Sequence, residues 1–319
     1  MKQVLIHNRF IFLAAIIILS GCYKYSVDPL PSTPLQINFT QPDIFPEGIA
    51  YDPGHYRFFV SSGSVGDIGI VTPDGLYKTF IKDKNLTGTN GLKVDEDRQR
   101  LWVCNRDNGI GAYNLNSGAC IFFTDLSLLL PGVPVFINDV VIDPQGNAYV
   151  TNTVAPVIYK ITPTGKASVF FNNDAFATGP DDFGFNGIEY NKKGFLLVAF
   201  SNEVVKIPLA NPNGYSIVKL DGEFYPDGLL LSKDGKQLVV VNDTGGTPDD
   251  SVLSFISNDD WQSGTLSTSF STGAVFPTDI TTDGNRVFVV YSHLDKLLSG
   301  GSQDTFTIQE IALKEAGEF

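Results

Sequence analysis

The sequence predicts an all-β fold, a six-bladed β-propeller whose ring is closed by an N-terminal strand that completes the last blade. A phrase of one polar residue, then Gly or Asp, then an apolar strand, a turn and a second strand recurs six times. Its copies lie about 40 to 50 residues apart, which is the period of a four-stranded propeller blade. The 31 glycines and 18 prolines supply the frequent turns that short strands need. The copies start at Glu47, Asn90, Asn138, Asn186, Asp227 and Thr278.

The N-terminus has the pattern of a secretory signal. A basic start is followed by an uncharged apolar run at residues 10–19, which is too short to span a bilayer. The Leu-Ser-Gly-Cys sequence that ends at Cys22 resembles the lipobox of bacterial lipoproteins, in which the cysteine is acylated. The alternative is an ordinary signal peptide with an incidental cysteine.

The chain therefore divides into three predicted parts. Residues 1–21 are the lipoprotein signal peptide, residues 22–34 are the lipidated cysteine and a proline-containing tether, and residues 35–319 are the propeller. This organisation places the protein on the bacterial cell envelope. We expect a monomer that contacts the membrane only through its lipid anchor.

The composition excludes one class of partner. The formal net charge is −13, and no basic stretch offers a track for phosphates. Nucleic-acid binding is therefore not expected.

Each repeat continues in the same way after its first strand. In the first copy, a turn at residues 51–54 leads to a strand at 57–60, and strands at 68–71 and 76–80 follow. In the fifth copy, a turn at residues 232–235 leads to a β-branched strand at 237–241. Asp, Pro and Gly form the turns, and the apolar runs between them have the length of strands. The repeated unit is therefore a four-stranded antiparallel sheet.

The two ends of the domain fit a closed ring. The sixth unit has predicted strands at 279–282, 286–291 and 305–311, and it lacks a fourth. The segment 35–40 alternates cleanly between polar and apolar residues and precedes the first copy. This segment can supply the missing strand, which would leave no open edge between the first and last blades.

Two cysteines lie inside the predicted domain. Cys104 and Cys120 fall on the second and fourth strands of one unit, so a strand separates them. The resulting distance of about 9 to 10 Å is too long for a disulfide. The sequence predicts two free, buried thiols.

The repeat also places oxygen-bearing side chains together. In a propeller, the first strand of each blade lines the central channel, so the six starting residues converge on one mouth, and all six carry side-chain oxygen. Because first and second strands are antiparallel, the ends of the second strands, among them Arg106 and His293, should rim the same mouth. The alternative is that Asn and Asp before Gly only form turns. Glu47 argues against that alternative, since Glu is not a preferred turn residue.

Such a cluster predicts a cation site. Each unsatisfied buried oxygen costs about 1 to 3 kcal/mol, so a narrow channel of them needs water or a cation. Two carboxylates and carboxamide oxygens suit a hard divalent ion, with Ca²⁺ first and Mg²⁺, Mn²⁺ or Zn²⁺ as alternatives. The few cysteines and histidines argue against a closed zinc site.

Four motifs resemble a known family. Pro46-Glu47-Gly48 and the segments 138–147, 185–188 and 226–229 are similar to those of the SMP-30/gluconolactonase/LRE-like six-bladed propellers, whose wider relatives include the paraoxonases. The resemblance covers nearly all of residues 40–312. It implies one divalent cation.

The resemblance also implies roles for residues at the channel mouth. The residues that it implies as metal ligands are Glu47, Asn186 and Asp227, and the residue that it implies as a substrate contact is Asn138. Three further residues are expected at the same mouth as candidate substrate contacts: Asn90, Arg106 and His293.

The implied reaction is metal-assisted hydrolysis of a lactone or a related ester. The cation would polarise the carbonyl, and Asp227 would accept a proton from the attacking water. No Gly-x-Ser-x-Gly elbow occurs, which disfavours a covalent serine nucleophile. His293 is either a general base or a solvated residue of the rim.

The sequence also departs from the sugar-lactone members of the family. Those members usually carry an arginine shortly before the Asn-Asp pair, whereas this chain has Pro-Val-Phe-Ile at residues 134–137. Aromatic residues near the channel mouth either pack between blades or line a pocket, and in the second case the substrate is less polar than an aldonolactone. A non-catalytic propeller that binds a ligand or partner around a structural cation remains the alternative. The aromatic residues are Phe136, Phe183, Phe185, Phe224 and Tyr225.

Overall fold

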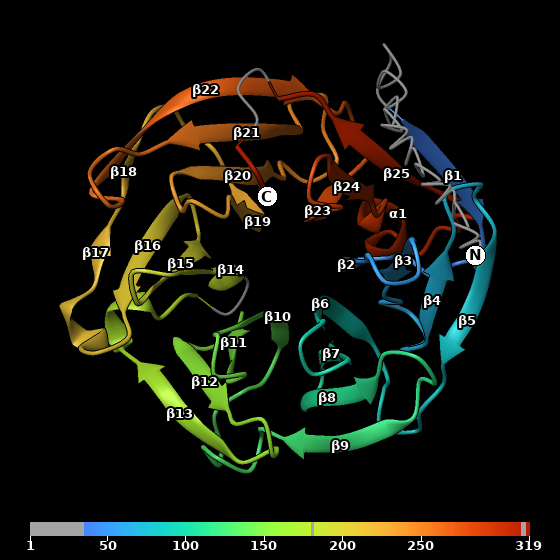
Figure 1. The fold of residues 1–319 in the computed structure, drawn as a ribbon, viewed down its shortest axis with the longest axis horizontal. Helices are drawn as coiled ribbons and strands as arrows, with labels where there is room; N and C mark the ends of the chain where they lie inside the picture. The colour runs from blue at the N-terminus through green and yellow to red at the C-terminus, as the bar shows by residue number, and fades with distance from the viewer. Residues whose placement is uncertain (1–34, 180–181, 314–316) are drawn as a thin grey trace, which may run out of the picture. The chain divides into compact units, whose positions relative to one another are not determined.

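The computed structural model describes residues 35–179, 182–313 and 317–319. The predicted signal peptide, the lipidated Cys22 and the tether lie outside the described residues. Within the described part, six sheets are arranged around a central axis, with their first strands innermost (Figure 1). The predicted all-β, six-bladed propeller is confirmed.

The first three blades follow the chain in order and have four strands each. Blade 1 contains β2 (Ile49–Asp52), β3 (Arg57–Val60), β4 (Ile68–Val71) and β5 (Tyr77–Ile81). Blade 2 contains β6 (Thr89–Asp95), β7 (Arg100–Asn105), β8 (Gly109–Asn114) and β9 (Cys120–Asp125). Blade 3 contains β10 (Ile137–Ile142), β11 (Ala148–Asn152), β12 (Val157–Ile161) and β13 (Ala167–Asn172).

The last three blades vary this plan. Blade 4 contains β14 (Phe185–Asn191), β15 (Phe195–Phe200), β16 (Glu203–Pro208) and β17 (Ser216–Ile217). Blade 5 contains β19 (Pro226–Leu231), β20 (Gln237–Asn242), β21 (Ser251–Ile256) and β22 (Ser263–Ser271), with β18 (Lys219–Leu220) added in parallel at its edge. Blade 6 contains β23 (Pro277–Thr282), β24 (Val287–Tyr291), β25 (Thr305–Ile311) and β1 (Gln36–Thr40).

The ring closes through β1, as the sequence predicts. β1 pairs antiparallel with β25 over its whole length, from Gln36 opposite Gln309 to Thr40 opposite Thr305. Alternate residues Ile37 and Phe39 are buried, because they face the hydrophobic cluster between the last and first blades. The N-terminal strand therefore joins the two ends of the described domain.

A bulge interrupts the first strand of five blades at the residue pair that starts the repeat. The pairing register shifts between Thr89 and Leu92, and it shifts at the equivalent place in β10, β14, β19 and β23. A bulge places two residues opposite one and re-aims a side chain. The repeated polar pair is therefore the bulge, which explains why its side chains turn toward the channel.

The remaining elements are short. They are the 3₁₀ turns η1 (Asp174–Phe176) and η2 (Pro212–Gly214) and the helix α1 (Leu294–Leu298) between β24 and β25. Among the described residues, no helix has both the length and the apolar character needed to cross a membrane.

The two cysteines correct one prediction. Both are free, and they lie on β7 and β9 as predicted. Cys104 is buried, whereas Cys120 is exposed, so the prediction of two buried thiols is wrong for Cys120. Cys120 opens the outermost strand of its blade, whose first residues have a neighbouring strand on one side only.

Candidate functional site

The bulged pairs enclose a small cavity in the channel. Its volume is about 10 Å³, enough for roughly one water molecule or ion. Five of the six starting residues line it, while Asn90 instead donates from Nδ2 to the carbonyl oxygen of Ile137 at 3.1 Å. The lining residues are Glu47, Gly91, Asn138, Asp139, Asn186, Gly187, Asp227, Gly228, Thr278 and Asp279.

Four carboxyl groups share this cavity, and all have raised pKa values. Burial, followed by repulsion from Asp227, raises the pKa of Glu47 well above its usual range. Burial, followed by repulsion from Asp243, does the same for the pKa of Asp227. Burial and repulsion from Asp139 raise the pKa of Asp279 well above normal. Burial raises the pKa of Asp139 to about 6, although Lys93 opposes the shift.

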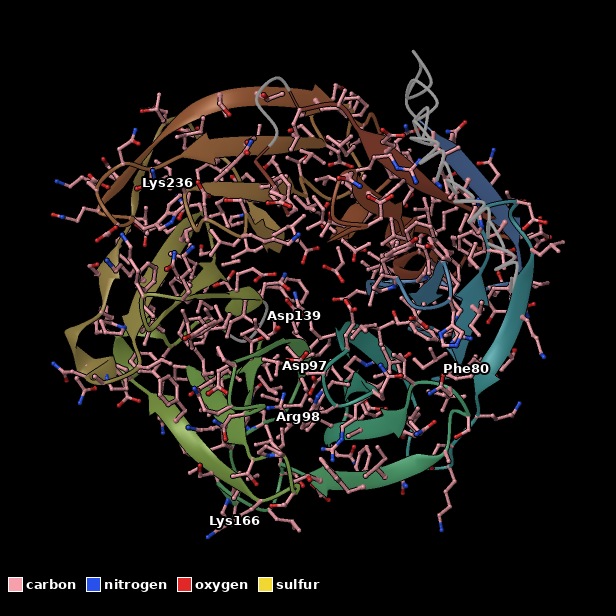
Figure 2. All side chains as sticks on the ribbon, viewed as in Figure 1. Phe80, Asp97, Arg98, Asp139, Lys166 and Lys236 are labelled. Carbon is pink, nitrogen blue, oxygen red and sulfur yellow. The ribbon has the colours of Figure 1, made fainter. Side chains whose placement is uncertain are left out.

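Asp139 and Asp279 are the site residues that sequence reasoning missed. Each accepts a backbone hydrogen bond from the residue after it and another from the next blade. Asp139 binds the N–H groups of Val140 at 2.7 Å and Ile188 at 3.0 Å. Asp279 binds those of Ile280 at 2.7 Å and Ile49 at 2.9 Å. Figure 2 shows Asp139 close to the centre of the ring.

A signal for these residues exists in the repeat. Blades 3 and 6 carry Asp at the second position of the bulged pair, where the other four blades carry glycine. A Cβ at Gly91 would lie 2.4 Å from Oδ1 of Asp139, so the glycine gives the carboxylate its space. Asp139 in blade 3 and Asp279 in blade 6 lie on opposite sides of the six-bladed ring, and each connects its own blade to the next one.

A charged pair crosses the channel further along the inner strands. Lys93 on β6 donates to Oε1 of Glu189 on β14 at 2.7 Å, which connects blades 2 and 4. Burial opposes the charge of Lys93, but Glu189 and Asp139 outweigh burial and raise its pKa. The channel therefore contains a half-buried lysine of its own beside the carboxyl groups.

A larger cavity of about 880 Å³ adjoins the small one, since both are lined by Asn186 and Asp227. Its volume is in the range of small-molecule sites. Ser201 and Asp243, which directly follow the second strands of blades 4 and 5, also line it, as does the aromatic Tyr225. The small cavity thus connects, through Asn186 and Asp227, to a space that can hold a substrate.

The aromatic residues divide between the two predicted alternatives. Phe185 and Phe224 are buried and pack between blades. Phe183 and Tyr225 are exposed and line the larger cavity. The guanidinium carbon of Arg106 lies over the Phe136 ring, 5.9 Å from the ring centre, and Phe136 lines neither cavity.

Arg106 and His293 do not line either cavity. Arg106 donates to the carbonyl oxygen of Gly63 at 3.2 Å and pairs with Asp107, although its charge reaches far enough to oppose the raised pKa of Glu47. His293 has a left-handed backbone and precedes α1, with its ring 6.4 Å from Phe306. Burial and then Lys296 lower its pKa. Asn90, Arg106 and His293 are therefore the predicted substrate contacts that line neither cavity.

The predicted metal ligands do lie together. Glu47, Asn186 and Asp227 all line the small cavity, and Asn186 shares a hydrogen bond with the Asp227 side chain. Across the described residues, no three His, Cys, Asp or Glu side chains are grouped closely enough to hold one metal ion. The predicted set contains only two carboxylates and one amide. Its oxygen donors and mutually repelling buried charges fit a hard divalent cation, which would relieve that repulsion.

No protein-family model matches the sequence, nor does any curated protein. Many solved structures match the fold. The allergen Mala s 1 of Malassezia sympodialis is 17% identical, over 90% of this chain and 99% of its own, with a TM-score of 0.69. A gluconolactonase of Xanthomonas campestris is 15% identical, over 87% and 89%, with a TM-score of 0.60. The calcium-binding protein regucalcin of Agrobacterium tumefaciens is 16% identical, over 87% and 94%, with a TM-score of 0.61.

These similarities establish the fold. The chain shares its six-bladed propeller fold with the gluconolactonase and regucalcin. The resemblance inferred from the sequence motifs is therefore confirmed for the fold, and activity and metal use are matters for the site itself.

Proposed function

We propose that this protein hydrolyses lactones or related esters with the help of one divalent cation, Ca²⁺ in the first instance, held by Glu47, Asn186 and Asp227. The observation that carries the proposal is the position of these three side chains. They line a cavity the size of one ion, and two of them also line a cavity of about 880 Å³ that can hold a small molecule. The gluconolactonase and the calcium-binding protein with the same fold support it.

The residues of the site fit the steps of hydrolysis. A divalent cation bound here would polarise the ester carbonyl and stabilise the negative charge that develops on its oxygen. Asp227 borders both cavities, so its carboxylate is placed to take a proton from the attacking water. Asn138 lines the small cavity and can donate a hydrogen bond to the substrate. The proton taken by Asp227 can then pass to the leaving alkoxide.

The cellular location is part of the same proposal. The Leu-Ser-Gly-Cys sequence ending at Cys22 supports a lipid anchor, and the tether that follows would hold the propeller at the cell envelope. Labelling with a radioactive fatty acid tests this location, because Cys22→Ser should abolish incorporation. Incorporation that persists in the variant would refute the anchor.

A second function is favoured by one observation. Although four carboxyl groups line the small cavity, the described residues contain no group of three His, Cys, Asp or Glu side chains that could hold one metal ion. A non-catalytic propeller that binds a ligand or protein around the channel would need no catalytic cation. Metal-dependent turnover of any lactone or ester would exclude this alternative.

The test combines metal analysis with a substrate panel. Residues 23–319 are assayed for bound metal and for hydrolysis of lactones and esters with and without a chelator. Glu47→Gln and Asp227→Asn should lower turnover by at least about 100-fold, as expected for loss of an ion ligand or a general base. Asp97→Asn removes an exposed carboxylate outside both cavities and serves as the control. If both site variants keep the metal and full activity, the assignment is wrong.

A further inference from the structure

The larger cavity has acidic walls and no basic side chain. Asp182, Asp227, Asp243 and Asp295 line it, and Lys, Arg and His are absent from its lining among the described residues. The chain as a whole has 22 basic and 35 acidic residues, so this one-sided lining is more acidic than the average composition. A substrate that carries negative charge, such as a phosphorylated or carboxylated ester, would be repelled here.

The acidic groups of the cavity also lack basic partners. The salt bridges between described residues involve none of these four carboxylates. In a different cavity of about 480 Å³, the Asp95 carboxylate is instead paired with Arg98. The larger cavity is therefore lined by acidic groups that no basic side chain of the described residues pairs with.

Exposed apolar side chains gather at the same cavity. Phe183, Tyr225 and Leu298 line it while being 65%, 59% and 76% exposed, and they are among the most exposed large apolar residues of the described domain. Exposed apolar groups that gather around a cavity mark a binding surface. The faces of aromatic rings also attract cations.

Two residues of the cavity wall have an uncommon backbone conformation. Phe276 and Ser201 line the cavity with φ angles of 52°, in the left-handed region that few residues other than glycine adopt. Such strain persists where the surrounding structure holds a side chain in place, and it is concentrated at ligand sites. With Phe183, Phe200 and Tyr225, Phe276 makes four aromatic residues in the cavity wall.

We propose that the larger cavity selects a positively charged ligand with an aromatic or alkyl body, so that the preferred substrate is an ester or lactone that carries an ammonium or similar group. The carboxylates attract the charge, and the aromatic and aliphatic side chains cover the body. As a statement about the substrate, this inference rests on the proposed function. As a statement about binding, it is independent of turnover.

Binding of three small benzyl compounds tests the inference without hydrolysis. Calorimetry on residues 23–319, with Ca²⁺ and with a chelator, compares benzyltrimethylammonium, benzyl alcohol and phenylmethanesulfonate, which are cationic, neutral and anionic. We expect the cation to bind at least about tenfold more tightly than the alcohol and the anion not to bind. Equal affinities for the three compounds, or tighter binding of the anion, would overturn the inference.

Variants locate the effect. Asp243→Asn with Asp295→Asn should weaken binding of the cation at least about tenfold and leave binding of the alcohol unchanged. Asp295→Asn alone changes an exposed side chain and provides the same test, with a smaller loss, if the double variant does not fold. Asp97→Asn is the control and should bind as the wild type does. Unchanged cation binding in a folded Asp295→Asn variant and in the double variant would refute the assignment to this cavity.

The outcomes separate the two proposals. Selective cation binding without any metal-dependent turnover would support the cavity chemistry and contradict the hydrolase. Turnover of neutral lactones without preference for a charged one would support the hydrolase and overturn the inference about its substrate.

Discussion

Replacing Asp243 by Asn should make the protein more stable above neutral pH and leave its stability near pH 4 unchanged. Burial raises the pKa of this carboxyl to about 7, and the nearby carboxylates of Asp250 and Asp295 contribute in the same direction. Oδ1 of Asp243 accepts the N–H of Gly245 at 2.8 Å, a bond that Asn can keep through its own oxygen. The substitution therefore removes the charge and can keep the bond from Gly245, although the carboxyl group also accepts a bond from Gly246.

The magnitude follows from the difference between the two states. An unperturbed carboxyl of this kind titrates near 3.8, so folding raises the pKa of Asp243 by about 3 units, or about 4 kcal/mol of free energy. The native state binds this proton more tightly than the unfolded state. The corresponding stability is present below about pH 4 and is lost as pH rises through about 7. Because the side chain keeps some exposure, we expect about 2 to 4 kcal/mol.

Urea denaturation at pH 4, 5, 6, 7 and 8 in the presence of a chelator measures this difference. The free energy of unfolding of Asp243→Asn minus that of the wild type should rise from near zero at pH 4 to about 2 to 4 kcal/mol at pH 8. Asp97→Asn, at an exposed position, should show a small difference that does not change with pH. If the free energies of unfolding of the wild type and of Asp243→Asn change with pH in parallel, the pKa of Asp243 is not raised by folding.

Three further perturbations address the metal, the ring closure and the thiols. Ca²⁺ at about 100 times its dissociation constant should stabilise the wild type by about 2.7 kcal/mol in thermal unfolding, and Glu47→Gln should abolish most of that gain; equal gains would contradict the site. Phe39→Ala should cost about 3 to 5 kcal/mol in urea, since Phe39 packs against Phe306 at the seam; a cost below about 1 kcal/mol would show that β1 does not close the ring. Maleimide should label Cys120 in the native protein and Cys104 only after unfolding, as read by mass spectrometry; labelling of both in the native state would contradict the burial of Cys104.

The six-bladed ring could be predicted because each blade has its own local sequence signals. Each blade repeats the same hairpin signals, so the period of the polar pairs was enough to count six units. The closure was visible for a similar reason, because the last unit lacks one strand and the segment at residues 35–40 alternates like an edge strand. The structure forms the expected pairing of β1 with β25.

Details inside the channel were harder to predict because they depend on the bulges. A bulge changes which of two adjacent side chains faces the channel, and the sequence does not show where the register shifts. Asp139 and Asp279 are therefore absent from the site residues that the sequence predicts. Asn90 was expected at the mouth, but its side chain reaches the backbone of the next blade.

The larger cavity could not be predicted from the repeat. Its walls include η1, the segment around Phe183 and the end of α1, which come from loops that differ between blades. The sequence repeat predicts only the strands and turns that all blades share. These loops differ from blade to blade, so the repeat contains no information about them. Arg106 and His293 occupy expected strand ends, yet local contacts with Gly63 and Phe306 draw their side chains to other places.

Because β1 pairs with β25, the ring can close only after the chain has been synthesised through β25. The backbone N–H of Leu35 binds the Glu310 carboxylate across 275 positions of sequence, so the earliest strand of the domain waits for the latest one. Until then, Ile37 and Phe39 lack the blade 6 side chains of their cluster, such as Phe306, and the backbone of β1 lacks its partner strand. We expect the ring to close late in folding, since closure joins strands far apart in the sequence. A product that stops before β25 would lack the strand with which β1 pairs, and its ring would stay open.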